Sequence, residues 1–88
     1  MRVLCWDRKA WEEYEKLQGN TQLLKRVNKL IKDILRNGYN SNYGKMEMLT
    51  GDFKGYASIR IDSKNRIVFK ADQDTVTIYQ CGGHYSDK

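Results

Sequence analysis

The stretch YASIRIDSKNRIVFKADQDTVTIYQC, residues 56–81, decides the fold of this chain. Apolar and polar residues alternate through its three segments, 56–61, 66–71 and 75–81. Such alternation is typical of strands that bury one face. Four polar residues, 62–65, separate the first two segments, and three, 72–74, separate the last two. Links this short join antiparallel neighbours. The stretch therefore predicts three strands of an antiparallel sheet.

The alternation also sorts the side chains between two faces of the sheet. One face is apolar and suits a covering of helices, and its residues are Ala57, Ile59, Ile61, Ile67, Phe69, Ala71, Val76 and Ile78. Gln80 is a polar exception on this face. The open face, with Val68 as an apolar exception, carries Tyr56, Ser58, Arg60, Arg66, Lys70 and Tyr79. A three-residue loop at 62–64 places Arg60 opposite Arg66. Facing like charges are unfavourable, so either an anion lies between the arginines or both extend into solvent.

The residues before this stretch add a short strand and a first helix. An apolar run within 2–6 predicts the strand. Asp7 is a favoured N-cap, so a helix is expected to begin there and run to about Gln18. Its apolar side, expected to face the sheet, consists of Ala10, Tyr14 and Leu17. Gly19 and Asn20 then break the helix.

A second helix is two-sided. Asn20 or Thr21 can cap its start, and Gly38 ends it. Its apolar side is Leu24, Val27, Leu30, Ile31 and Ile34. The opposite side has a basic stripe that consists of Lys25, Lys29, Lys32 and Arg36. This stripe is either a solvated face or a surface for RNA phosphates, and the pattern leaves both open.

Together with a short strand expected over 45–49, these elements indicate an α+β fold. Two N-terminal helices are expected to pack on one face of a small, mainly antiparallel sheet of four to five strands. The 88 residues suffice for one domain and are too few for two. The whole chain, 1–88, is therefore expected to form a single domain.

Composition narrows the classes of partner. The chain has 16 Lys and Arg against 11 Asp and Glu, a net charge of +5 that favours anionic partners such as nucleic acid. Cys5 and Cys81 are too few for a disulfide scaffold and are expected to be free thiols. No apolar run is long enough to cross a membrane, and the N-terminal residues do not resemble an export signal. A cytoplasmic protein without a membrane role is therefore expected.

Two residues are candidates for acid–base chemistry. His84 is the only histidine and follows two glycines that free the backbone; its alternative is an idle imidazole in a frayed tail. Glu47 is flanked by two methionines. One interpretation is a partly apolar setting, which would raise the pKa of Glu47 and make it a better base. The alternative is an ordinary surface glutamate. Cys81 and His84 have a two-ligand metal spacing, but too few further ligands accompany them for a structural zinc site. No metal or other cofactor is expected.

RNA cleavage would use these groups together. The ribose 2′-hydroxyl attacks the adjacent phosphorus, which requires a base, an acid and a cation for the extra charge. These roles can be filled without a metal by Glu47, His84 and Arg66 with Arg60. An alternative is a non-catalytic RNA- or ribosome-binding module, in which the tyrosines of the open face stack on bases. A third possibility is a protein that uses its basic face only to bind an acidic chain.

Six short motifs follow one another along nearly the whole chain. They are WDRKAWEEY at 6–14, KRVNKLIKDI at 25–34, GKMEML at 44–49, GYASIRI at 55–61, NRIVF at 65–69 and HY at 84–85. Each is weak alone, but their order and spacing are specific. In this combination the chain resembles the YoeB/Txe toxins of the RelE superfamily, the ribosome-dependent mRNA interferases of bacterial toxin–antitoxin pairs.

The resemblance implies a RelE-like fold and a set of functional residues. It implies a general base at Glu47, a general acid at His84 and a phosphorane-stabilising arginine at Arg66. It also implies a phosphate contact at Arg60 and a substrate-placing aromatic residue at Tyr85. The cleavage would occur on mRNA in the ribosomal decoding site, and the basic stripe would meet ribosomal RNA. The implied partner is a YefM/Axe-like antitoxin whose flexible segment covers or distorts the active site.

The chain departs from the family pattern around the expected base. The family has prolines beside this glutamate and a lysine shortly after it, where this chain has Met46, Met48 and Thr50. That lysine contacts a phosphate of the substrate. Lys45 and Lys54 are the nearby candidates to replace its contact.

Overall fold

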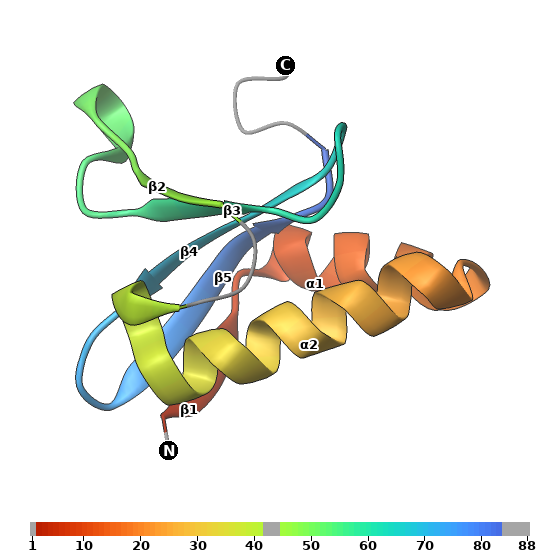
Figure 1. Ribbon diagram of the computed structural model, residues 1–88, viewed down its shortest axis with the longest axis horizontal. Helices are drawn as coiled ribbons and strands as arrows, with labels where there is room; N and C mark the ends of the chain where they lie inside the picture. The colour runs from red at the N-terminus through yellow and green to blue at the C-terminus, as the bar shows by residue number, and fades with distance from the viewer. Residues whose placement is uncertain (1, 42–44, 84–88) are drawn as a thin grey trace.

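The computed structural model describes residues 2–41 and 45–83, and within them two helices cover one face of a five-stranded sheet (Figure 1). The strands are β1 (Val3–Trp6), β2 (Met46–Met48), β3 (Ala57–Arg60), β4 (Arg66–Ala71) and β5 (Thr75–Cys81). The helices are α1 (Arg8–Lys16) and α2 (Thr21–Asn37), and single 3-10 turns span Leu17–Gly19, Gly38–Asn40 and Gly51–Phe53. This architecture confirms the predicted α+β class. None of the helices in the described residues is long and apolar enough to span a membrane.

The sheet is mixed, in the order β1-β5-β4-β3-β2. The hairpins β3–β4 and β4–β5 are antiparallel, as their short links predict. β2 also pairs antiparallel with β3, whereas β1 pairs in parallel with β5. The predicted pairing of Arg60 with Arg66 is confirmed. Local alternation did not predict where β1 lies, because its neighbour depends on the path of the two helices between β1 and the rest of the sheet.

The hydrophobic core lies between the sheet and the helices. From the helices it contains Ala10, Val27, Leu30, Ile31 and Ile34, and from the strands and the β3–β4 turn it contains Ala57, Ile59, Ile61, Ile67, Phe69, Val76, Ile78 and Cys81. Tyr14 and Leu17 pack against this core, as their spacing predicted, while Leu24 is half-buried. α1 ends at Lys16, two residues earlier than expected, and the chain tightens into a 3-10 turn before Asn20.

The ends of α2 are held by specific contacts. The side chain of Asn20 accepts a hydrogen bond from the backbone N–H of Leu23 at 3.1 Å, which confirms it as the N-cap. At the other end Gly38 has φ of 57°, a conformation that glycine adopts readily. The guanidinium of Arg2 donates to the carbonyls of Leu35 and Arg36 there, each at 3.2 Å. Arg2 therefore links the N-terminal strand to the end of α2.

The end of β5 departs from simple alternation. Val68 pairs with Gln80, but Phe69 pairs with Ile78, so Tyr79 is an extra residue in a β-bulge. The extra residue shifts the alternation by one position. Gln80 therefore lies across from Val68 on the open face, and its predicted place as a polar exception on the covered face is wrong. Cys81 takes the core position instead and is 1% exposed.

Burial changes the acid–base behaviour of Cys81. Cys5 and Cys81 are both free thiols, as predicted. Two causes raise the pKa of the Cys81 thiol to about 12: mainly its removal from water, and to a smaller extent the nearby Glu13 charge. At neutral pH this thiol stays protonated, the form in which cysteine is a poor nucleophile and a poor metal ligand.

We expect the protein to lose stability as the pH rises from 9 towards 12. The unfolded chain releases the Cys81 proton near pH 9, whereas the folded chain keeps it until about pH 12. The stabilisation is therefore complete below pH 9, and rising pH favours the unfolded state within this window. Urea unfolding at several pH values measures the decline, which Cys81→Ala should make shallower. An identical decline in both proteins would show that another group is responsible.

Candidate active site

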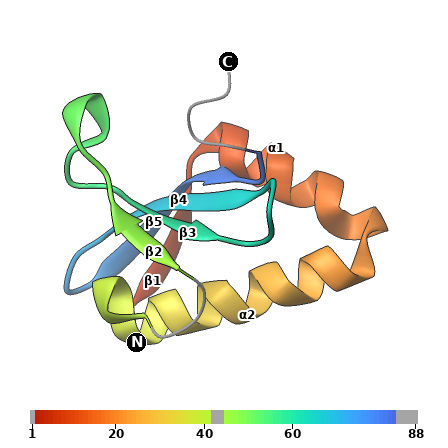
Figure 2. The same cartoon turned by 45° about the horizontal axis from the view of Figure 1, so that its top comes forward.

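The candidate residues gather on the face of the sheet that the helices leave open, which Figure 2 turns towards the viewer. Glu47 in β2 pairs with Ser58 in β3, and Ser58 pairs with Val68 in β4. Two residues further along β3 and two residues back along β4, Arg60 pairs with Arg66. Strands of a sheet lie about 5 Å apart, so these residues of distant sequence positions become neighbours.

A salt bridge joins two of the predicted catalytic residues. Nη2 of Arg66 lies 3.1 Å from Oε1 of Glu47, and Nη1 of Arg66 donates to Oγ of Ser58 at 2.9 Å. The Arg66 side chain is only 11% exposed, whereas the Glu47 side chain is 59% exposed. The guanidinium is thus fixed by two partners, while the carboxylate remains open to solvent and to a ligand.

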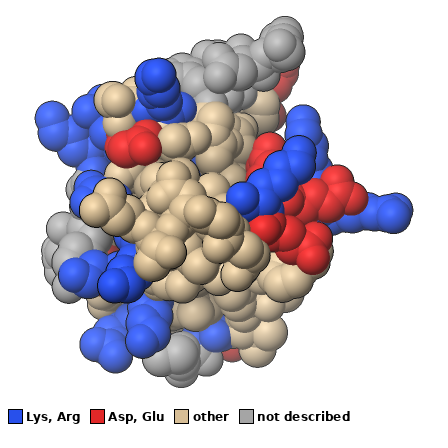
Figure 3. Space-filling model, turned by 90° about the vertical axis from the view of Figure 1, so that its right-hand side faces the viewer, with Lys and Arg blue, Asp and Glu red and all other residues tan. Residues whose placement is uncertain are grey.

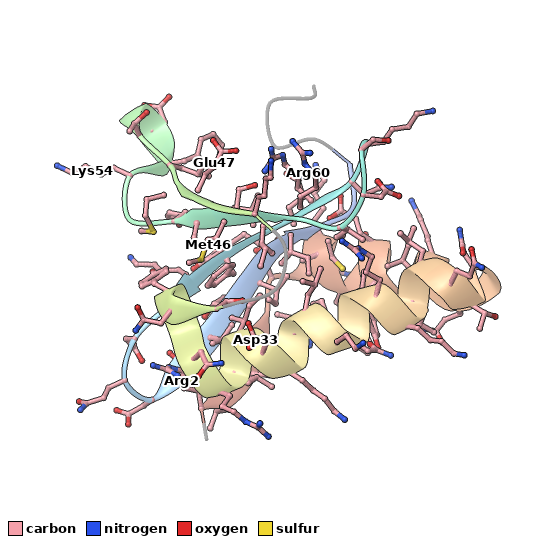
Figure 4. All side chains as sticks on the ribbon, viewed as in Figure 1. Arg2, Asp33, Met46, Glu47, Lys54 and Arg60 are labelled. Carbon is pink, nitrogen blue, oxygen red and sulfur yellow. The ribbon has the colours of Figure 1, made fainter. Side chains whose placement is uncertain are left out.

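The surroundings of Glu47 differ from the expected partly apolar setting. Met46 packs against the core, and Met48 is largely exposed. Alternation along β2 directs both methionines to the side of the strand opposite Glu47. Figure 4 shows Glu47 on the side of the sheet away from the helices. The carboxylate therefore has a charged and solvent-accessible setting, which fits the surface glutamate of the two alternatives rather than the partly apolar one.

Three cations follow one line across the strands. The backbone N–H of Arg60 donates to the carbonyl of Lys45 at 3.2 Å, which places Lys45 beside Arg60, and Arg60 pairs with Arg66. We call Lys45, Arg60 and Arg66 the cation row. Lys45 and Arg60 are exposed, while Arg66 turns to Glu47 and Ser58. This direction of the Arg66 side chain reduces the repulsion between the paired arginines, because their guanidinium groups need not face each other.

The backbone after β5 stays beside Arg66. The N–H of Arg66 donates to the carbonyl of Gly83, and the N–H of Gly82 donates to the carbonyl of Arg66, both at 2.9 Å. The N–H of Gly83 donates to Oδ1 of Asn65 at 2.8 Å. His84 and Tyr85, which the sequence also predicted as site residues, lie outside the described residues. The described chain thus ends next to the candidate catalytic arginine.

Three residues that support this geometry were not identifiable from the sequence pattern. Ser58 is fully buried and holds Arg66. Asn65 holds Gly83, and the carboxylate of Glu13 in α1 accepts a hydrogen bond from the N–H of Cys81 at 2.9 Å. Only the open-face position of Ser58 was readable from the alternation. The contacts of Glu13 and Asn65 depend on how α1 and the β3–β4 turn lie against the end of β5.

The basic stripe and Lys54 lie apart from the Glu47–Arg66 pair. All four residues of the basic stripe are exposed on α2, in the layer on the other side of the sheet. In the view of Figure 3, mainly positive side chains lie along the left flank, whereas acidic and positive side chains are mixed on the right. Lys54 follows the 3-10 turn after β2, and its side chain points away from Glu47 (Figure 4). Within 2–41 and 45–83, no three His, Cys, Asp or Glu side chains group as metal ligands would.

Similarity to known proteins covers almost the whole chain. The family described as YoeB-like toxin of bacterial type II toxin-antitoxin system matches residues 6–85. Toxin YoeB of Streptomyces coelicolor is 41% identical over 77 residues, which are 86% of this chain and 90% of that protein. The YoeB dimer of Staphylococcus aureus superposes with a TM-score of 0.86 at 34% identity, covering 96% of this chain and 98% of its own. A heterotetrameric YoeB–YefM toxin–antitoxin complex from the same organism gives a TM-score of 0.85 at 34% identity over 97% and 99% of the two chains.

Proposed function

This chain belongs to the YoeB-like toxins of bacterial type II toxin–antitoxin systems, and from that premise we propose that it is an endoribonuclease that cuts translated mRNA on the ribosome. The observation that carries the proposal is the Glu47–Arg66 pair on an open, cationic sheet face. A protein that only binds RNA needs the positive charge, but binding alone does not require a carboxylate beside it. A carboxylate next to a fixed guanidinium suits proton removal close to a phosphate.

The proposed reaction uses Glu47, Arg66, Arg60 and His84 in the following way. Glu47 accepts the proton of a ribose 2′-hydroxyl, whose oxygen forms a bond to the adjacent phosphorus. Arg66, with Arg60 beside it, stabilises the additional negative charge on the phosphate oxygens. The bond from phosphorus to the 5′-oxygen then breaks, and His84 gives that oxygen a proton. The products are a 2′,3′-cyclic phosphate and a 5′-hydroxyl.

The proposed role of His84 is supported by the preceding residue, Gly83, which is held next to Arg66. Gly83 is hydrogen-bonded to the backbone of Arg66, and consecutive Cα atoms are about 3.8 Å apart. We therefore expect the imidazole to reach the leaving oxygen of a phosphate bound by Arg66. Tyr85 follows as the aromatic residue that would place the substrate.

The proposed partners are an antitoxin, the ribosome and mRNA. The Staphylococcus aureus relative was solved in complex with YefM, which supports a YefM-like antitoxin for this chain. A flexible antitoxin segment that covers the open face would block Glu47 and Arg66. The exposed basic stripe suits the phosphates of ribosomal RNA, and the site of action would be the cytoplasm, where mRNA is translated.

A cell-free translation reaction tests the proposal directly. We expect cuts within the translated codons of a defined message, mapped by primer extension, and none in the same RNA without ribosomes. A variant with Glu47→Ala, Arg66→Ala and His84→Ala should leave the message intact. Intact message in the presence of the unmodified protein and active ribosomes would refute the nuclease, and so would equal cutting by the triple variant. Translation arrest without cleavage would favour the non-catalytic binding module.

Removing charge from the basic stripe should weaken ribosome binding without changing the chemistry. We expect a Lys25→Gln, Lys32→Gln variant to need more protein for half-maximal cleavage but to reach the same maximal rate. The logarithmic salt dependence of ribosome binding should become shallower by roughly 0.7–0.9 for each RNA phosphate that the variant no longer neutralises. Lys9→Gln, Lys16→Gln on α1 is the control with the same charge change. If the control variant had the same effect, net charge rather than the stripe would explain it.

A further inference from the structure

An aromatic cluster lies on the open face beside the Glu47–Arg66 pair. The rings of Tyr56 and Tyr79 are 4.7 Å apart at their centroids and tilted by 55°. The ring of Phe53 meets Tyr56 edge-on at 6.3 Å, and Nζ of Lys70 lies 5.6 Å from the centre of the Tyr56 ring. We call Tyr56 and Tyr79, with Lys70 beside them, the aromatic platform.

The backbone fixes the platform relative to the candidate active site. Tyr56 precedes β3, and its carbonyl accepts from the N–H of Leu49 at 2.9 Å, which continues the β2–β3 pairing. Tyr56 lies two residues before Ser58 and four before Arg60, and Lys70 lies four after Arg66, so alternation places them on the same face. Four residues of strand span roughly 13 Å. The platform and the cation row thus lie on either side of Glu47 on one face of the sheet.

Strand β5 contributes Tyr79 to this surface. Val76 and Ile78 lie in the core, so the alternation of β5 places Tyr79 on the open face. The bulge makes Tyr79 the extra residue between the pairs Val68–Gln80 and Phe69–Ile78 and brings Gln80 next to it on the same face. The ring of Tyr79 contacts that of Tyr56 there. Burial is the main reason that the pKa of Tyr79 is raised above its usual value of 10, and a hydrogen bond with Tyr56 is the second. The Tyr79 phenol is therefore neutral at physiological pH and does not repel a nearby phosphate.

The surface combines the two features that bind single-stranded nucleic acid. Aromatic rings stack on unpaired bases, and cations beside them attract the backbone. Phe53 and Lys70 are exposed, and both tyrosines are partly exposed. Lys70 has a long side chain that can move from the ring to the phosphate of a bound nucleotide. Lys70 beside the Tyr56 ring, and the cation row further along the same face, favour an RNA strand over an apolar peptide as the occupant.

We propose that Tyr56 and Tyr79, assisted by Lys70, form a stacking site for an unpaired nucleobase that flanks the phosphate bound at Arg66. The inference rests on the proposed endoribonuclease function and adds a base-binding subsite to it. The site places the RNA by one base and one phosphate, which limits sliding of the strand along the open face. Stacking tolerates every base, so the subsite contributes affinity and register more than sequence selection.

The test measures binding of a short RNA to the intact protein, without cleavage. The probe is a fluorescein-labelled, 2′-O-methylated hexaribonucleotide, whose affinity is measured by fluorescence anisotropy at low salt. We expect Tyr56→Leu and Tyr79→Leu each to weaken binding by roughly 5- to 150-fold, the range typical of losing one stacked base. Tyr56→Phe and Tyr79→Phe should bind like the unmodified protein, because they keep the ring. Trp11→Leu, which removes an exposed aromatic from α1, should also leave binding unchanged.

An abasic scan of the RNA makes the test independent of any effect of the variants on folding. Replacing one nucleotide at a time by an abasic unit should weaken binding to the unmodified protein at one position. The same replacement should have little effect on the Tyr56→Leu protein, because its stacking partner is already absent. Absence of RNA binding, no sensitive position, or equal losses in both proteins would overturn the proposal.

The outcomes separate this inference from the proposed function. If a position is sensitive to base removal but translated mRNA stays intact, the stacking site is supported and the nuclease is rejected. If mRNA is cut but the leucine variants bind RNA like the unmodified protein, the stacking site alone is rejected. If the leucine variants lose binding to an antitoxin but not to RNA, the cluster is a protein-binding surface and the inference fails.

Discussion

Glu47→Gln and Arg66→Ala are each expected to lower the rate of mRNA cleavage by roughly 100- to 10,000-fold, the range typical of losing a positioned base or a preorganised cation. Glu47→Gln retains an oxygen that can accept from Arg66 but cannot take a proton at neutral pH. Arg66→Lys should recover only part of the activity, because one ammonium cannot reproduce the planar contacts to Ser58 and Glu47. Primer extension on a translated message at increasing protein concentration measures the maximal rate.

A second glutamate–arginine pair provides the control. Arg8 and Glu12 form an ion pair of 3.8 Å on α1, and the Glu12 side chain is 58% exposed, close to the value for Glu47. Glu12→Gln therefore makes the same chemical change as Glu47→Gln at a similar exposure, and Arg8→Ala removes the same charge as Arg66→Ala from a more exposed position. We expect both control variants to leave cleavage unchanged. Because groups that act on one phosphate are not additive, the Glu47→Gln, Arg66→Ala double variant should lose less than the product of the single losses. Full activity of Glu47→Gln would assign the base to another residue.

Phe69→Ala is expected to lower the free energy of unfolding by about 3–5 kcal/mol, as is typical of removing a large buried ring. Phe69 is fully buried in the middle of β4, and its ring stacks against that of Tyr39 at 5.7 Å. The neighbouring segments cannot fill the volume of the missing ring without moving the strand that carries Arg66. Urea unfolding followed by circular dichroism measures the loss.

The matched control for this prediction lies on β1. Val3 is 63% exposed, so Val3→Ala should change the free energy of unfolding by no more than about 0.5 kcal/mol. A loss from Phe69→Ala as small as that of the control would mean that the region between β4 and α2 is loosely packed. The expected large loss would confirm that the core supports the sheet from below the candidate site.

The local periodicity of the sequence determined most of the elements. Alternation of polar and apolar residues predicted β3, β4 and β5, and the spacing of apolar residues at three and four predicted α1 and α2. The three-residue turn at 62–64 also fixed the register that pairs Arg60 with Arg66. These features were predictable because each depends on residues close together in the chain. The functional roles of Glu47 and His84 came from the family resemblance, since a single glutamate or histidine has no local pattern.

Only the tertiary structure decided how the distant parts meet. The parallel pairing of β1 with β5, and the contact of Glu13 with the end of β5, depend on the path of two helices that the local pattern does not encode. The bulge at Tyr79 places Gln80 on the open face and Cys81 in the core, the reverse of what alternation alone predicts. One extra residue has this effect because side chains of a strand change face at every residue. The salt bridge between Glu47 and Arg66 joins residues from two strands that are not adjacent in the sheet. It forms because β3 lies between them with a small serine, over which the long arginine side chain can reach the carboxylate.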